Sequence, residues 1–138
     1  MPDTALPPVI HRLWQAWNAH DGEAVAACLQ PDYQSQQPLH PERNFSGRDL
    51  ARQSWNAIFN ATPNFHAELL RHAINGAQVW TEWRWRGDHT DGPAFSAGGV
   101  MIFELHADHI DSVRAYTETQ TLACPDFDQI LDDILHEA

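Results

Sequence analysis

The side chains of this sequence best suited to proton transfer are a glutamate, a tyrosine and a loop histidine. Glu118 stands near the end of an alternating segment, Tyr33 follows Pro-Asp, and His89 lies in Gly-Asp-His-Thr-Asp-Gly. Apolar surroundings disfavour the charged form of a carboxylate, so its pKa rises toward the range useful for acid–base catalysis. A buried phenol supplies one donor that can orient a carbonyl or stabilise an enolate. We therefore consider Glu118, Tyr33 and His89 the candidate catalytic residues.

Each of these residues also has a structural interpretation. Glu118 could be a solvated strand end or an arginine partner, and His89 could belong to a polar turn whose composition serves the turn itself. His89 and Asp91 share no recognisable metal-ligand spacing with His106 or His109. We expect no metal site and no cofactor.

Aromatic residues indicate a pocket for a flat, mostly apolar ligand. The segment Val79–Arg86 alternates, so Trp83 and Trp85 share one strand face and Trp80 lies on the other. Alternation does not tell which of these faces lines the pocket. The predicted pocket residues are Trp14, Trp17, Gln36, Trp55, Phe59, Trp83, Met101, Arg114 and Tyr116.

Three helices are expected in the first half of the chain, because apolar residues recur there at helical spacing. They run from Pro7 to His20, from Glu23 to Leu29 with Asp21 as its cap, and from a Ser46 cap to Ala61. A short strand, residues 32–37, lies between the second and third helices.

The second half changes to the alternating pattern of strands. Strands are predicted at 65–73, 78–86, 94–105 and 109–119, with a hairpin turn at Asn75-Gly76. In the last strand Ile110, Ser112, Arg114, Tyr116 and Glu118 are expected on one face. Helices followed by an antiparallel meander predict an α+β layer architecture.

Several ordered segments resemble the SnoaL-like (polyketide cyclase-like) proteins of the nuclear transport factor 2-like superfamily. The first are Trp14-Gln-Ala-Trp17-Asn-Ala-His-Asp21, Pro31-Asp32-Tyr33 and Phe45-Ser-Gly47-Arg-Asp-Leu. The later ones are Pro63-Asn-Phe65-His-Ala-Glu68, Gly99-Val-Met-Ile-Phe103 and Arg114-Ala-Tyr116-Thr-Glu118. The similarity spans residues 9–122.

This resemblance implies a cone-shaped fold, with N-terminal helices packed on a curved antiparallel (mixed) sheet. It also implies a carboxylate near the end of the last strand, the position that Glu118 matches. Many relatives carry a histidine where this chain has Gln36, which can hold a polar group but cannot accept a proton at neutral pH.

Two functions remain open, since fold does not determine function. One is cofactor-free cyclase, isomerase, dehydratase or hydratase chemistry on a small apolar cyclic metabolite. The other is a non-catalytic ligand-binding or dimerisation module.

Composition limits the class of protein. The 138 residues suit one domain, 1–138, and the net charge of −11 makes nucleic-acid binding very unfavourable. All eight cationic residues are arginines, which excludes Schiff-base and Walker-type chemistry. No apolar run is long enough for a membrane span and no secretory signal is evident, so we expect a cytoplasmic protein with reduced Cys28 and Cys124.

The last segment, 125–138, is predicted to be an additional amphipathic helix capped by Asp126. Its apolar stripe comprises Phe127, Ile130, Leu131, Ile134 and Leu135. The stripe must be covered by the same subunit or by a partner, and a homodimer is the simplest expectation.

Overall fold

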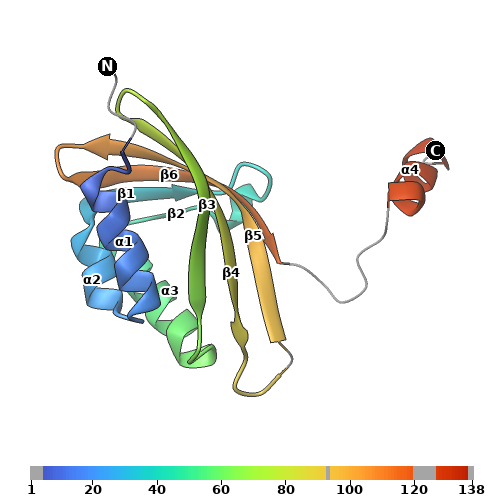
Figure 1. The fold of residues 1–138 in the computed structure, drawn as a ribbon, viewed down its shortest axis with the longest axis horizontal. Coiled ribbons are helices and arrows are strands. Elements are labelled where there is room, and N and C mark those ends of the chain that lie inside the picture. The colour runs from blue at the N-terminus through green and yellow to red at the C-terminus, as the bar shows by residue number, and fades with distance from the viewer. Residues whose placement is uncertain (1–4, 93, 120–126, 137–138) are drawn as a thin grey trace.

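A computed structural model describes residues 5–92, 94–119 and 127–136 (Figure 1). Three helices lie on the concave side of a curved six-stranded sheet, as the α+β prediction requires. The elements are α1 (Pro8–Asn18), α2 (Gly22–Ala27), β1 (Leu29–Gln36), a 3₁₀ turn (Pro41–Arg43), β2 (Phe45–Ser46), α3 (Arg48–Ala61), β3 (His66–Asn75), β4 (Gln78–Asp88), β5 (Ala94–His106), β6 (His109–Thr119) and α4 (Phe127–His136).

The helix starts follow local capping chemistry. Asp21 caps α2 as predicted, and its carboxylate accepts a hydrogen bond from Ala24 N at 3.0 Å. The predicted cap of α3 is wrong, because Gly47 occupies that position with φ of +102°. Ser46 instead belongs to β2, a strand the sequence did not predict, where its hydroxyl donates to Gln34 Oε1 at 2.8 Å.

The sheet order is β2-β1-β6-β5-β4-β3. All neighbouring strands are antiparallel except β1 and β6, which are parallel, so the sheet is mixed. The strand β1 begins at Leu29, earlier than predicted, and its pairing with β6 shifts register between Leu29 and Gln34. Regular pairing of β1 with β6 ends at Gln36 opposite Arg114, which leaves the last residues of β6 beyond its neighbour.

One register shift corrects the predicted faces of the last strand. Leu105 pairs with Ile110 but Glu104 pairs with Ser112, so β6 carries one extra residue, Asp111, at this point. Ile110 is therefore fully buried with Val113, and does not share a face with Ser112 and Arg114.

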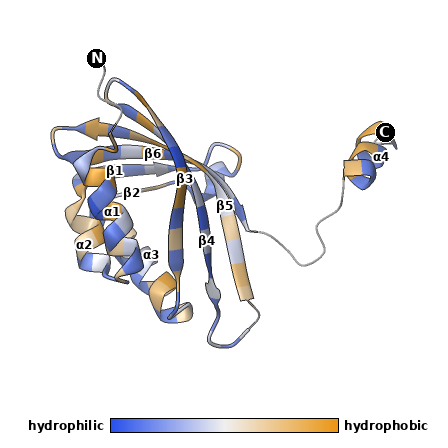
Figure 2. Ribbon diagram, in the orientation of Figure 1, coloured by the Kyte–Doolittle hydropathy of each residue, from blue (hydrophilic) through white to orange (hydrophobic). Residues whose placement is uncertain are grey.

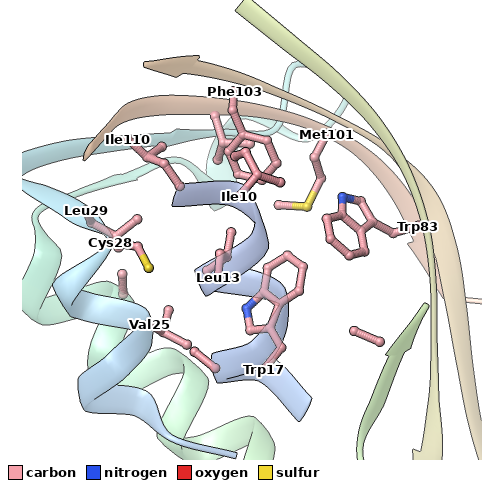
Figure 3. Packing of buried hydrophobic residues seen from close by; sticks show 14 of the residues in the cluster. Ile10, Leu13, Trp17, Val25, Cys28, Leu29, Trp83, Met101, Phe103 and Ile110 are labelled. Atoms are coloured by element: carbon pink, nitrogen blue, oxygen red, sulfur yellow. The ribbon is translucent and has the colours of Figure 1, made fainter. Parts of the chain in front are cut away.

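The core lies between α1 and the sheet (Figure 3). The α1 residues Ile10, Leu13 and Trp17 project toward Trp83, Met101 and Phe103 of the strands. The Trp17 ring makes an edge contact with Trp83 at a centroid distance of 4.8 Å. The strand residues Val79, Thr81, Trp83 and Trp85 are all buried, so this side of β4 faces the helices.

Two side chains of α1 hold the edge strand β3. Asn18 Oδ1 accepts a hydrogen bond from Ala67 N at 2.7 Å, and Asn18 Nδ2 donates to Ala67 O at 3.0 Å. Trp14 Nε1 donates to the same carbonyl at 2.9 Å. These contacts satisfy backbone groups that an edge strand otherwise leaves unpaired.

The helix α4 carries the predicted apolar stripe, and none of its described residues is buried. Figure 2 shows hydrophobic residues on this helix, which lies apart from the sheet and the other helices. The predicted cap, Asp126, lies outside the described residues. No helix in the described ranges is long and apolar enough to cross a membrane.

Candidate functional site

A pocket of about 800 Å³ opens between α3 and the concave side of the sheet. Its walls are mostly apolar and strongly aromatic, with residues from α1, α2, α3 and every strand from β1 to β6 except β3. The apolar lining consists of Leu13, Trp17, Val25, Leu29, Phe45, Trp55, Ala57, Ile58, Ala61, Phe65, Trp85, Phe95, Ala97, Met101, Phe103 and Ala115.

Polar lining residues gather where the pocket meets solvent. We define the pocket mouth as Gln37, Arg43, His89, Glu118 and Thr119, which are exposed or half-buried residues of the lining. Tyr33 is the ionisable side chain of the buried wall among the lining residues. The pocket thus has an apolar interior and ionisable groups at its mouth.

Glu118 forms a close pair with a histidine from a distant loop. Its Oε1 lies 2.8 Å from His40 Nε2, and His40 Nδ1 lies 3.7 Å from Glu42 Oε1. The Glu118 side chain is 65% exposed and that of His40 is 32% exposed. Because β1 stops pairing at Gln36, the loop that follows it can reach the free end of β6. The site therefore contains a carboxylate–imidazole pair in partial contact with water.

His40 was not among the predicted site residues. It lies 78 residues from Glu118, between Leu39 and Pro41, in a loop without periodicity or a motif. The family resemblance predicts a histidine at position 36, where this chain has glutamine. The only signal in the sequence was a histidine in a proline-bearing loop directly after the strand of Tyr33.

Tyr33 lies in the apolar wall and is 7% exposed. Burial raises the pKa of its phenol well above the ordinary value, and a hydrogen bond with Ser35 only partly opposes this rise. The phenol is therefore neutral at physiological pH and available as a hydrogen-bond donor. Its ring meets Phe45 edge-on at a centroid distance of 6.3 Å.

His89 also belongs to the pocket mouth and lies in the loop between β4 and β5. Its Nδ1 is 3.4 Å from the hydroxyl of the buried Thr62, and its ring lies against Phe95. Asn64 holds the loop through two hydrogen bonds with Asp88, one to its carboxylate at 3.0 Å and one from its backbone N–H at 2.7 Å. These bonds keep His89 near the end of α3.

The predicted pocket residues divide into two groups. Trp17, Trp55 and Met101 line the pocket, as do Tyr33, His89 and Glu118. Six others do not, which corrects the prediction: Trp14, Gln36, Phe59, Trp83, Arg114 and Tyr116.

Strand direction and packing explain the six exceptions. Ala115 and Thr117 line the pocket, so Arg114 and Tyr116 point to the other side of β6. Glu118 alternates with Arg114 and Tyr116, but it lies at the end of β6, beyond the residues that pair with β1, and belongs to the pocket mouth there. Gln36 is exposed, and its neighbours Ser35 and Gln37 line the pocket instead. Trp14, Phe59 and Trp83 pack elsewhere in the core or against it.

Side chains that could bind a metal ion do not cluster among the described residues. Within residues 5–92, 94–119 and 127–136, no three His, Cys, Asp or Glu side chains are placed to hold a metal ion. Cys28 is a buried free thiol, and Cys124 lies outside the described residues.

Solved structures with a similar fold cover most of the chain. A protein with a ketosteroid isomerase-like fold from Catenulispora acidiphila, in complex with trimethylamine, is 18% identical with a TM-score of 0.69, covering 81% of this chain and 86% of that one. A SnoaL-like polyketide cyclase-type protein from Jannaschia is 15% identical with a TM-score of 0.66, covering 84% and 92%. An LEH-like epoxide hydrolase from M. tuberculosis is 16% identical with a TM-score of 0.66, covering 92% and 86%.

These identities are too low to show more than the fold. A search of curated proteins found no match. The family model described as SnoaL-like domain matches residues 10–113, most of the chain, and confirms the predicted resemblance. The chain therefore belongs to the SnoaL-like domain family and has the nuclear transport factor 2-like fold of its structural neighbours.

Proposed function

We propose that the protein binds a small, mostly apolar organic molecule in the pocket and catalyses a cofactor-free acid–base reaction at the pocket mouth. The observation that carries this proposal is the 2.8 Å contact between Glu118 and His40 beside an aromatic-walled pocket. The reaction belongs to the isomerase, cyclase or lyase class, in which one proton is removed and another is delivered. Neighbours with isomerase-like, cyclase-type and epoxide hydrolase names support this class as an analogy.

The side chains suggest a division of roles. Glu118 accepts a proton from the ligand, and His40, hydrogen-bonded to it, orients the carboxylate and stabilises its charge when protonated. Tyr33 donates a hydrogen bond to a ligand oxygen in the apolar interior, where a neutral donor is effective. Gln37 replaces the predicted Gln36 as the amide that meets the ligand at the pocket mouth.

A second candidate is non-catalytic ligand binding. It is favoured by the 65% exposure of the Glu118 side chain, since a carboxylate in contact with water is a weaker base than a buried one. Among the residues that the structure describes, the buried lining contains no carboxylate or imidazole, so a ligand deep in the pocket would meet apolar walls and the Tyr33 phenol.

The test compares binding and turnover in wild type and two charge-neutralised variants. Thermal shift is measured with steroid, aromatic polyketide, terpenoid and epoxide compounds, and hits are assayed for conversion by mass spectrometry. At a hundred times its Kd, a ligand stabilises the folded state by about 2.7 kcal/mol. We expect Glu118→Gln to bind a hit but to lose about 100-fold or more of the turnover rate.

The control is Asp111→Asn, which neutralises an exposed carboxylate of the same strand outside the pocket lining. It should retain both binding and turnover. Binding without turnover in wild type would favour the non-catalytic candidate. A complete lack of hits would contradict both candidates for these ligand classes.

A further inference from the structure

The charged groups at the pocket mouth are unevenly paired. The Glu118 carboxylate lies 2.8 Å from His40 Nε2, so this negative charge has a partner within the protein. Arg43 also belongs to the mouth and is the one described lining residue with a permanent positive charge. It forms no ion pair with any described residue. The mouth therefore carries a cation that no described carboxylate contacts.

The loop between β1 and β2 holds Arg43 at this place. Gln37 N donates a hydrogen bond to Asn44 Oδ1 at 2.7 Å, which joins the two ends of the loop. Within the loop, His40 N donates to Gln37 O at 2.8 Å, and Arg43 N donates to His40 O at 2.9 Å. In Figure 1 this loop lies beside β6, in agreement with the contact between His40 and the end of that strand. A hydrogen-bonded backbone thus positions the arginine at the mouth.

The same loop brings an amide side chain near the guanidinium. Gln37 lines the pocket, and its backbone bond to Asn44 places it close to the residue that follows Arg43. A carboxylate can accept two parallel hydrogen bonds from a guanidinium and a further one from an amide N–H. Together the two side chains suit a carboxylate group of the ligand.

The rest of the pocket restricts the molecule that can carry this group. Behind the mouth the lining is apolar and aromatic, which favours a hydrocarbon or ring body. The net charge of −11 and the nearby carboxylates of Glu42 and Glu118 disfavour a dianion such as a phosphate ester, whose charge one arginine would not neutralise. A single carboxylate on an apolar body fits both conditions.

We propose that the ligand of this pocket is an apolar carboxylic acid, and that Arg43 binds its carboxylate at the pocket mouth. The inference rests on the ligand pocket of the proposed function and adds the chemical class of the ligand. Glu118 and His40 stay available to the part of the ligand beside them, because Arg43 neutralises the carboxylate. Arg43 is thus a binding residue and takes no part in proton transfer.

Matched acids and esters test the role of the ligand charge. The probes are naphthoic acid with methyl naphthoate, and abietic acid with methyl abietate, since each ester keeps the apolar body and removes the charge. The Kd of each compound is measured by isothermal titration calorimetry with the full-length protein at neutral pH and low salt. We expect wild type to bind each acid about tenfold more tightly than its ester. Added salt should weaken the binding of the acids and not that of the esters.

Three arginine variants locate the effect. Arg43→Gln removes the charge, so the preference for acid over ester should fall about tenfold while the Kd of the ester stays as in wild type. Arg43→Lys keeps the charge but loses the planar fork, and should restore part of the preference. The matched control is Arg48→Gln, which changes a half-buried arginine outside the pocket lining and should keep the wild-type preference. Circular dichroism confirms that each variant is folded.

The outcomes separate this inference from the proposed function. Acids and esters that bind equally well to wild type would overturn the inference and leave a pocket for neutral ligands. A preference for acids that persists in Arg43→Gln, or that falls equally in Arg48→Gln, would also overturn it. If neither pair binds while neutral compounds of the thermal-shift panel do, only the inference fails. If no compound binds at all, the proposed function fails with it.

Discussion

Tyr33 is a single residue whose surroundings change its chemistry. The strand β1 directs its phenol into the apolar wall, where burial raises its pKa and keeps the hydroxyl protonated. Glu118, in contrast, is exposed. It lies at the free end of β6 and pairs with His40 in partial contact with water. The pocket therefore combines a buried neutral donor with an ionisable pair at its mouth.

The raised pKa of Tyr33 predicts a loss of stability at alkaline pH. The unfolded state releases the phenol proton near pH 10 but the folded state retains it, so stability is full below that pH and falls above it. The expected decrease is about 1.4 kcal/mol per pH unit above about pH 10. Urea denaturation between pH 9 and pH 11 should show a smaller slope in Tyr33→Phe.

Two features of the chain make this measurement interpretable. It has no lysine, so few other groups titrate in the same range. Burial also raises the pKa of the Cys28 thiol, but wild type and Tyr33→Phe share that contribution. The control Tyr116→Phe removes an exposed phenol and should leave the slope as in wild type. Equal slopes in all three proteins would contradict the buried-phenol interpretation.

At the scale of elements, a glycine lets the strands β5 and β6 lie close together beside the pocket. Gly99 has φ of +142°, and a Cβ at this position would collide with the backbone oxygen of Tyr116. The strands β5 and β6 approach closely here, next to the lining residues Ala97 and Met101. A residue with a side chain would force the two strands apart.

We predict that Gly99→Ala destabilises the protein by about 2 kcal/mol or more, because alanine is strained in this conformation and meets backbone atoms. The free energy of unfolding from urea titration measures the effect. The matched control is Gly92→Ala in the loop before β5, where an added Cβ makes only an ordinary contact at 3.7 Å with His89. A similar loss in both variants would show that the conformation and close contact of Gly99 are not the cause.

At the scale of the whole molecule, the six tryptophans report on two separate surfaces. Trp17, Trp55 and Trp85 line the pocket, and Trp14 and Trp83 pack around them in the core. Among the described tryptophans only Trp80 is exposed, on the side of β4 opposite to the buried Trp83 and Trp85. Ligand binding in the pocket should therefore affect the lining indoles and not Trp80.

Intrinsic fluorescence tests this separation. A compound that enters the pocket should change the emission of wild type and of Trp80→Phe to the same extent, because the lining indoles remain. In Trp55→Phe the ligand-induced change should be smaller, since a lining indole is lost. A response that disappears in Trp80→Phe would mean that the compound binds beside the exposed Trp80 and not in the pocket.

Much of the fold was predictable because it depends on local patterns. Helical spacing located α1 and α4, the Asp21 cap located α2, and alternation located β3 to β6 within a few residues. The strand β2, which has two residues, was missed, and the start of β1, which includes a proline and a register shift, was predicted too late. The cap of α3 was placed one residue early, since Ser46 satisfies its hydroxyl across β1 and β2 rather than at the helix.

The site was predictable only in part. The sequence by itself determined an acidic, tryptophan-rich α+β domain of the SnoaL-like family, with Tyr33 and Glu118 at positions that the pocket uses. Only the tertiary structure decided that Ala115 and Thr117, and not Arg114 and Tyr116, face the helices, and that His40 meets Glu118. Alternation shows that two strand faces differ, but which one is buried depends on where the helices pack. A contact between residues 78 positions apart depends on strand pairing and loop path, which leave no periodic signal in the chain.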